Sequence, residues 1–257
     1  MKDFVKEFQK FVRMLKAGEE FALGRFADGE GCIILNMDES QGGWVNRERL
    51  SARWQHIPGD PIHEAFRSRL TAALAYAAPG YHVGLPCRSD HSSRYAHFFG
   101  RLKSMTNVSE EQLTFARVFH SYNYRAFIED FLPTAFLRKV FLICNERADS
   151  SSLSGIVKRW DVAAENASLK SLSVIDEVKR YIVENRIRGG VFLLSAGPSS
   201  GIFAHELWHA NRDNSYVDIG SAMDPIYFRS SPCRGITRNY LEAHACGDTP
   251  ASPFVWG

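Results

Sequence analysis

The strongest constraint in this sequence is the alternation of short apolar runs with segments of helical period. The apolar runs cover residues 81–86, 139–145, 191–195 and 216–220, and a weaker run covers 20–24. The runs at 191–195 and 216–220 are nearly continuous in apolar residues, which is typical of strands covered by helices on both faces. These runs therefore predict the strands of a buried sheet.

Segments with the period of an amphipathic helix lie between these runs, at 60–76, 92–103, 172–183 and 199–211. Strands that alternate with helices predict an α/β fold with a mainly parallel sheet flanked by helices. The sequence contains neither an internal repeat nor a Pro/Ser-rich linker. We therefore expect one domain over residues 1–257, with a loop-rich C-terminal tail from about residue 226.

The N-terminal segment predicts an amphipathic helix that Gly18 ends. One helical face carries the apolar residues Phe4, Val5, Phe8, Phe11, Val12 and Leu15. Packing of this face on the domain is favoured over membrane association, because the polar face carries acids as well as bases.

The charge balance excludes one large class of function. The chain has 31 Lys and Arg residues against 29 Asp and Glu residues, a formal net charge of +2. Nucleic-acid binders neutralise phosphates with a strongly basic face, so no nucleic-acid partner is expected.

No apolar stretch approaches the roughly 20 residues of a transmembrane segment. Without a signal-peptide pattern or a Cys-x-x-Cys pair, the sequence favours a cytoplasmic protein with reduced thiols.

The carboxyl ends of the expected strands carry most of the candidate functional residues. These ends cover residues 25–30, 84–88, 145–146, 195–200 and 220–224, and they are rich in Gly, Ser, Asn and acids. In open parallel sheets, ligands bind beyond the carboxyl ends of the strands. We therefore expect a ligand site at this edge, with Asn145 among its binding residues.

The first cluster is Gly24-Arg-Phe-Ala-Asp-Gly-Glu-Gly31. On a helix, Asp28 and Glu30 would point roughly 200° apart, whereas in an extended or tightly turned segment they can converge on one cation, and Gly29 leaves room for such a turn. Their oxygen ligands suit Mg²⁺ or Mn²⁺, and Arg25 can bind phosphate or carboxylate. The alternative is that Asp28 caps a helix over 31–35 and Glu30 stabilises its first turn. The spacing leaves both interpretations open.

The second cluster is Leu194-Ser-Ala-Gly-Pro-Ser-Ser-Gly201, which precedes an apolar helix. A helix N-terminus after such a turn presents backbone N–H groups to an anion, so Ser195, Gly197 and Ser199 are candidate diphosphate contacts. The segment matches neither a P-loop nor a Gly-x-Gly-x-x-Gly motif. A tight turn in which Ser199 or Ser200 caps the helix is the structural alternative.

The third cluster is Val217-Asp-Ile-Gly-Ser-Ala-Met-Asp-Pro225. Asp218 lies inside an expected buried strand, where a carboxylate needs a partner. Asp224 either begins a turn before Pro225, binds a sugar hydroxyl or acts as a general base.

Two further segments are weaker candidates for ligand binding, and one class of enzyme is disfavoured. Residues 119–125 mix aromatic and polar groups that suit sugar stacking, and residues 229–240 carry three arginines and no acid. A Ser/His/Asp hydrolase is disfavoured, because the sequence has no Gly-x-Ser-x-Gly elbow and no obvious Ser partner for its histidines.

Together the clusters resemble the signature of GT-D-type glycosyltransferases. Residues 24–30 are similar to the family's Arg-[Tyr/Phe]-[Gly/Ala]-Asp-Gly-Glu motif, with Ala27 where Gly is common. The similarity continues in order at 83–86, 123–124, 143–146, 195–198 and 218–224, and so spans about residues 20–240. The resemblance implies a Rossmann-like fold. It also implies transfer of a sugar from a nucleoside diphosphate sugar, expected to be a UDP-sugar, to a hydroxyl of a glycan or lipid-linked acceptor.

The resemblance also implies roles for individual residues. Asp28 and Glu30 would hold Mn²⁺ or Mg²⁺ against the diphosphate, and Asp224 would be the base. The donor would be bound by a set comprising Arg25, Gly29, Asn145, Ser195, Gly197, Ser199 and Asp218. A non-catalytic nucleotide-sugar or glycan-binding module and another Rossmann-like enzyme, such as a methyltransferase, are the alternatives. A lipid-linked acceptor would bring the protein to the inner membrane face.

Overall fold

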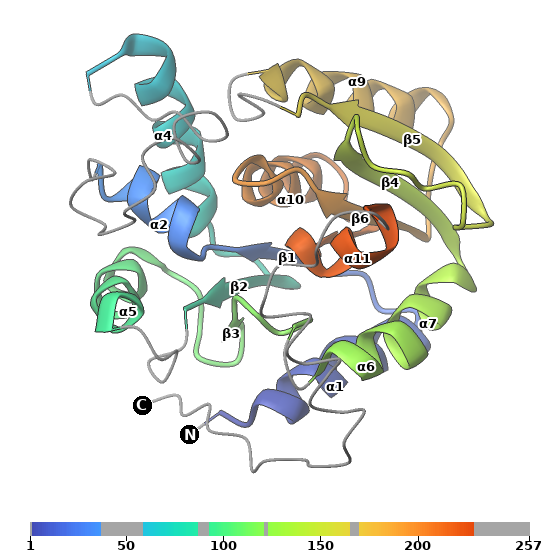
Figure 1. Ribbon diagram of the computed structural model, residues 1–257, viewed down its shortest axis with the longest axis horizontal. Helices are drawn as coiled ribbons and strands as arrows, with labels where there is room; N and C mark the ends of the chain where they lie inside the picture. The colour runs from blue at the N-terminus through green and yellow to red at the C-terminus, as the bar shows by residue number, and fades with distance from the viewer. Residues whose placement is uncertain (1, 37–58, 87–92, 121–122, 165–169, 229–257) are drawn as a thin grey trace.

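The centre of the fold is one parallel sheet. The computed structural model describes residues 2–36, 59–86, 93–120, 123–164 and 170–228. In these ranges seven strands, all paired in parallel, form a sheet with the order β3-β2-β1-β7-β6-β4-β5 (Figure 1). The strands are β1 Ala22–Arg25, β2 Tyr81–Leu85, β3 Leu113–Phe115, β4 Lys139–Asn145, β5 Ile156–Val162, β6 Gly190–Ser195 and β7 Ser215–Asp218.

The sheet confirms the α/β prediction and the five expected strands. Strands β6 and β7 are buried along nearly their whole length, as their apolar runs predict. The sequence analysis missed the two edge strands, β3 and β5. Strand β3 is only three residues long, and β5 alternates apolar residues with Lys158, Arg159 and Asp161, so neither has the signature of a covered strand.

Helices cover both faces of the sheet. Helices α4, α10 and α9 lie on one face, and α1, α6 and α7 lie on the other (Figure 1). The α-helices are α1 Phe4–Ala17, α2 Asp28–Ile34, α4 Pro61–Ala75, α5 Ser93–Met105, α6 Tyr124–Ala126, α7 Leu132–Phe136, α9 Leu172–Glu184, α10 Ser199–Ala210 and α11 Asp224–Tyr227. A π-helix, η2 Phe127–Phe131, and a 3-10 helix, η3 Gly220–Met223, complete the described elements. All five helices expected from periodicity are confirmed.

Helix α1 packs on the domain as its periodicity predicts. Asp3 caps its N-terminus by accepting a hydrogen bond from the Lys6 N–H at 2.9 Å, and Gly18 ends it in the left-handed conformation. Its apolar face is buried except for Val5, which is exposed, and Phe8 meets Phe119 edge-to-face with ring centroids 6.2 Å apart. This face is therefore part of the core and is not available for membrane insertion.

The other helical layer is joined by a three-helix ion-pair cluster. The Glu206 carboxylate of α10 accepts hydrogen bonds from Arg69 of α4 at 2.8 Å and from Lys179 of α9 at 2.8 Å. Burial alone would favour the neutral acid, but these two cations outweigh it and lower the pKa of Glu206.

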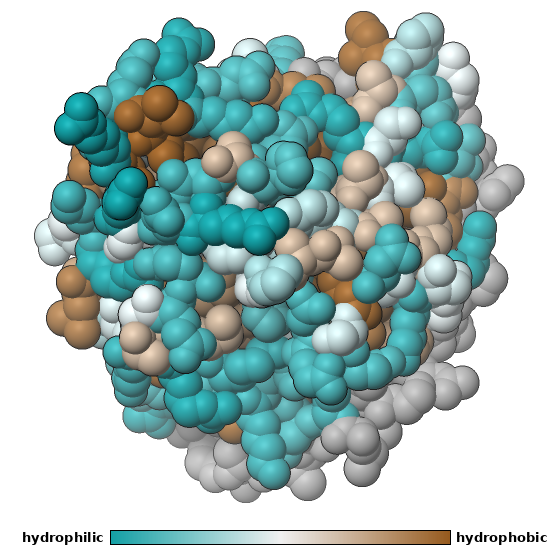
Figure 2. Space-filling view, turned by 180° about the vertical axis from the view of Figure 1, so that it is seen from behind, coloured by the Kyte–Doolittle hydropathy of each residue, from teal (hydrophilic) through white to brown (hydrophobic). Residues whose placement is uncertain are grey.

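The exposed surface carries few large apolar side chains. Among the described residues these are Val5, Ile62, Leu137, Val157 and Val183. Figure 2 shows a mostly hydrophilic face on which apolar side chains gather in small separate groups. None of the helices in the described part of the chain combines the length and the apolar character needed to cross a membrane. Of the tail expected from about residue 226, positions 226–227 belong to α11, and 229–257 lie outside the described residues.

Phe8→Ala should lower the free energy of unfolding by about 3–5 kcal/mol, because it leaves a cavity in the core. Val5→Ala changes a residue of the same helix that is 44% exposed, and it should cost about 0.5 kcal/mol or less. Urea unfolding followed by circular dichroism measures both. Equal effects of the two substitutions would contradict the packing of α1.

Glu206→Gln should destabilise the protein near pH 7, and by less at pH 3. Because the folded-state pKa of Glu206 is lowered, its stabilising contribution is present above the unfolded value of about 4.5 and is lost as the pH falls through the folded value. The measurement is the urea midpoint of wild type and variant at both pH values. Glu129→Gln, in an exposed ion pair with Arg125, is the control and should shift the midpoint little at either pH. A Glu206→Gln difference that persists unchanged at pH 3 would refute the ion-pair explanation.

Candidate active site

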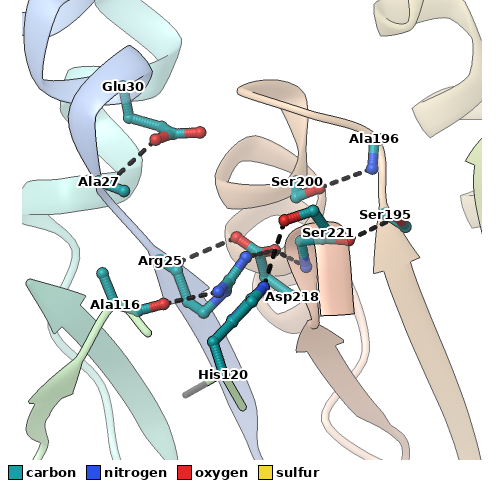
Figure 3. A network of polar contacts seen from close by, with 11 residues as sticks. Arg25, Ala27, Glu30, Ala116, His120, Ser195, Ala196, Ser200, Asp218 and Ser221 are labelled. Carbon is teal, nitrogen blue, oxygen red and sulfur yellow. Dashed lines mark hydrogen bonds and ion pairs between the residues drawn. The ribbon is translucent and has the colours of Figure 1, made fainter. Parts of the chain in front are cut away.

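The carboxyl ends of the parallel strands meet at one edge of the sheet, as the sequence analysis expects. Strand β1 ends at Arg25, its neighbour β7 at Asp218, and β6 beyond it at Ser195. Figure 3 shows these three residues in one network of polar contacts. This edge is where open α/β sheets bind ligands.

Asp218 has the partner that its position in a buried strand requires. Its Oδ1 accepts a hydrogen bond from Arg25 Nη2 at 3.2 Å, and its Oδ2 accepts one from the Arg25 backbone N–H at 3.2 Å. Burial raises the pKa of Asp218, and Arg25 and the backbone N–H of Gly220 oppose that effect. Arg25 Nη1 donates to the Ala116 carbonyl at 2.6 Å, so this guanidinium connects β1, β7 and the segment after β3.

Gly220 lies at the centre of this network. Its N–H donates to Asp218 Oδ1 at 2.9 Å, and its carbonyl accepts a hydrogen bond from Ser195 Oγ at 2.6 Å. Its φ is +51°, and a Cβ at this position would lie 1.6 Å from Arg25 Nη2. Only glycine therefore fits between the ion pair and the first turn of η3.

The acidic cluster forms the start of helix α2, three residues earlier than expected. Asp28 is the first helical residue and Ala27 is the N-cap, so the alternative in which Asp28 caps the helix is wrong. Glu30 Oε2 accepts a hydrogen bond from the Ala27 N–H at 3.0 Å, which confirms a stabilising role for Glu30 in the first turn. Gly29 is buried between the two acids.

The carboxylate oxygens of Asp28 and Glu30 have the chemistry that a hard divalent cation prefers, but both residues lie in the first turn of α2 and not in the extended or tight turn on which the prediction of convergence depends. Carboxylate oxygens are the ligands that Mg²⁺ and Mn²⁺ prefer. In the described ranges no three His, Cys, Asp or Glu side chains come together. A cation held by Asp28 and Glu30 would therefore complete its coordination shell with water and ligand oxygens, as Mg²⁺ usually does beside a diphosphate.

The Gly-Pro turn places the N-terminus of α10 at the same edge. Pro198 is the N-cap and supplies no side-chain acceptor, so the expected capping by Ser199 or Ser200 is wrong. Ser200 Oγ instead accepts a hydrogen bond from the Ala196 N–H at 2.9 Å, and the buried Ser199 Oγ accepts one from Ser171 at 2.6 Å. Gly197 makes the turn with a φ of +58°.

The first turn of α10 packs directly against the segment between β1 and α2. A Cβ on Gly201 would lie 3.2 Å from the Phe26 ring, so the absence of a side chain permits this close approach. The positive end of a twelve-residue helix therefore lies beside the turn that carries Asp28 and Glu30.

Two predicted site residues lie farther along the edge. Asn145 ends β4, and its Oδ1 accepts a hydrogen bond from the Arg147 N–H at 2.8 Å, so it shapes the turn to β5. Asp224 is the first residue of α11 and is half-buried. Helix α11 is held to the β4–β5 connection by a hydrogen bond from the Asp149 N–H to the Tyr227 carbonyl.

The aromatic segment after β3 is mostly core. Phe119 is fully buried, and Asn123 Nδ2 donates to the carbonyls of Phe4 and Val118 at 3.0 and 2.9 Å, so these residues are not a sugar-stacking surface. Residues 121–122 and the arginines of 229–240 lie outside the described residues.

One pair of polar side chains at this edge was not indicated by the sequence. No serine partner for a histidine is obvious from the sequence, but His120 Nε2 lies 3.2 Å from Ser221 Oγ (Figure 3). The two residues are 101 positions apart, and no local spacing could have indicated the contact.

Helix α10 also contains a His-Glu-x-x-His sequence, His205 to His209, which is the spacing of zinc metalloproteases. In that chemistry the glutamate is a general base, but here Glu206 is bound by Arg69 and Lys179. His205 packs on Tyr76 with ring centroids 4.5 Å apart. The segment therefore belongs to the helical layer and lacks the geometry of a protease site.

Solved structures with the same fold include three of one domain type. A structure described as a new glycosyltransferase (DUF1792) from Streptococcus sanguinis has a TM-score of 0.59 at 13% identity, over 88% of this chain and 85% of that chain. A selenomethionine-substituted structure of domain of unknown function 1792 has a TM-score of 0.55 at 14% identity, over 85% and 79%. A third, of the highly conserved domain of unknown function 1792 and described as a distinct glycosyltransferase fold, has a TM-score of 0.52 at 15% identity, over 85% and 79%.

The fold class is thus one described for glycosyltransferases. This chain has the α/β fold of the DUF1792 structures, which confirms the GT-D resemblance at the level of the fold. No family model matches the sequence, and no curated protein matches it significantly.

Gly220→Ala should strongly destabilise the protein, because the new Cβ would overlap Arg25 Nη2 at a position with positive φ. The expected loss is about 3 kcal/mol or more, as for other disruptions of buried ion-pair networks. Gly100→Ala in α5 is the control, since a Cβ there has no neighbour within 4 Å, and it should stabilise the helix by about 0.5–1 kcal/mol. Chemical denaturation measures both. A Gly220→Ala protein as stable as wild type would contradict the central position of Gly220.

Proposed function

We propose that this protein is a metal-assisted glycosyltransferase that uses a nucleoside diphosphate sugar. The observation that carries the proposal is the close packing of the α10 N-terminus against the β1–α2 segment, at the carboxyl edge of the sheet. An acidic turn suits a divalent cation, and a positive helix end suits an anion. A metal-bound diphosphate needs both, and the fold is one described for glycosyltransferases.

Asp28 and Glu30 would hold Mg²⁺ or Mn²⁺ against the diphosphate. When bound, the cation would act as a Lewis acid that stabilises the charge on the departing nucleoside diphosphate. The backbone around Gly197 and Ser199, at the N-terminus of α10, would bind phosphate oxygens and stabilise the same charge. Gly29 would let the diphosphate approach the backbone of the acidic turn.

The other residues of the predicted binding set would act mainly by stabilising the carboxyl edge of the sheet. Arg25 and Asp218 bind each other, and Ser195 binds the Gly220 carbonyl. Asn145 fixes the turn after β4. Asp224 would contact a sugar hydroxyl of the donor or of the acceptor. The acceptor would be a hydroxyl of a glycan or of a lipid-linked sugar, and the second case would bring the protein to the inner face of a membrane.

The first test is a thermal-shift screen with UDP, GDP and their sugars, each with and without Mn²⁺ or Mg²⁺. The expected result is stabilisation by a nucleoside diphosphate that depends on the metal, because the cation bridges the acidic turn and the phosphates. Asp28→Asn and Glu30→Gln should remove this stabilisation and reduce sugar transfer by at least about 10²-fold. Release of nucleoside diphosphate measures the transfer.

Glu129→Gln, on the exposed surface far along the chain from the acidic turn, is the control and should bind and react as wild type does. Full activity of either acidic-turn variant would overturn the metal assignment. Donor binding without turnover, with metal and acceptor supplied, would favour a non-catalytic module. Stabilisation by S-adenosylmethionine instead of a nucleotide would favour a methyltransferase.

A further inference from the structure

In the described part of the carboxyl edge, the contact between His120 and Ser221 joins a hydroxyl to a titratable base. The other described serines of this edge have different bonds: Ser195 donates to the Gly220 carbonyl, Ser199 accepts from Ser171, and Ser200 accepts from the Ala196 N–H. Ser221 Oγ instead lies 3.2 Å from His120 Nε2. Those three serines bond to backbone groups or to another serine, whereas Ser221 contacts a side chain that can take up a proton.

The burial of the two residues differs in a way that suits a proton relay. The His120 ring is only 8% exposed, whereas Ser221 is half-buried in the first turn of η3. Ser221 is therefore the more accessible member of the pair.

The position of the pair is fixed by the network around Gly220. Ser221 directly follows Gly220, whose N–H and carbonyl are bound by Asp218 and Ser195. His120 lies in the segment after β3, as does Ala116, whose backbone carbonyl accepts a hydrogen bond from Arg25 Nη1. Figure 3 shows His120 reaching Ser221 alongside the Arg25–Asp218 ion pair. Both members are thus anchored on the two sides of that pair, which is the preorganisation that proton transfer needs.

We propose that His120 and Ser221 accept the proton of the attacking acceptor hydroxyl; this inference rests on the proposed function. The acceptor oxygen uses a lone pair to form a bond to the anomeric carbon of the donor sugar. The bond from that carbon to the diphosphate oxygen breaks, and its electron pair leaves with the nucleoside diphosphate. The acceptor proton passes to Ser221 Oγ as the Ser221 proton passes to His120 Nε2, and the imidazolium later releases its proton to water.

This relay requires the neutral imidazole tautomer with its proton on Nδ1, so that Nε2 accepts from Ser221. The relay assigns the role of base to His120 in place of Asp224, because the Ser221–His120 contact joins a hydroxyl directly to an imidazole that can take up a proton. Asp224 keeps the role of binding a sugar hydroxyl.

The test compares variants that keep the hydrogen bond with variants that remove the proton acceptor. His120→Gln places an amide near the position of Nε2, so it preserves a bond to Ser221 but cannot take up a proton. Its kcat for release of nucleoside diphosphate from the UDP- or GDP-sugar that wild type uses should fall by about 10²–10⁴-fold, with KM within about twofold. Ser221→Ala should lower kcat likewise, and Ser221→Thr, which keeps a hydroxyl, should restore most of it.

The outcomes separate the relay from the function on which it rests. Wild-type kcat in His120→Gln or in Ser221→Ala overturns the relay while leaving a working transferase. Loss of kcat in Asp224→Asn alone would return the role of base to Asp224. If His120→Gln does not fold, as judged by its thermal unfolding, the Ser221→Ala and Ser221→Thr comparison decides the question. A wild-type protein that turns over no nucleotide sugar overturns the proposed function, and the relay with it.

Discussion

The carboxyl edge of this protein depends on the buried ion pair between Arg25 and Asp218. A carboxylate in a buried strand costs several kcal/mol of desolvation, and a partner with good hydrogen-bond geometry offsets that cost. Arg25 supplies two hydrogen bonds to Asp218, one from its guanidinium and one from its backbone. Because the same guanidinium binds the Ala116 carbonyl, a single side chain fixes the ends of β1 and β7 and the segment after β3.

The rest of the candidate site follows from this ion pair. Asp218 also binds the N–H of Gly220, and Gly220 has no side chain that would collide with Arg25. The first turn of η3 is thereby held against the edge, and it brings Ser221 to His120. On the β1 side, the strand leads from Arg25 directly into the acidic turn that packs against α10. The proposed donor site and the proposed proton relay thus both depend on the Arg25–Asp218 ion pair.

Much of the fold could be predicted from local patterns. The apolar runs indicated β1, β2, β4, β6 and β7, and helical periodicity indicated α1, α4, α5, α9 and α10, because burial on a sheet or helix face imposes a repeat on the residues themselves. The edge strand β5 was missed because its charged residues interrupt the apolar run by which the other strands were predicted. The end of β7 was also predictable in part, since the cost of burying a carboxylate required a partner for Asp218.

The sequence by itself determined which residues end the parallel strands, and therefore which residues share one edge. It also determined that Asp218 needs a counter-ion, through the desolvation cost of a buried charge. Only the tertiary structure decided that this counter-ion is Arg25 and that His120 meets Ser221. The physical reason is that these contacts depend on the order and register of the strands. That order is set by the packing of the whole sheet, which brings together residues about a hundred or more positions apart.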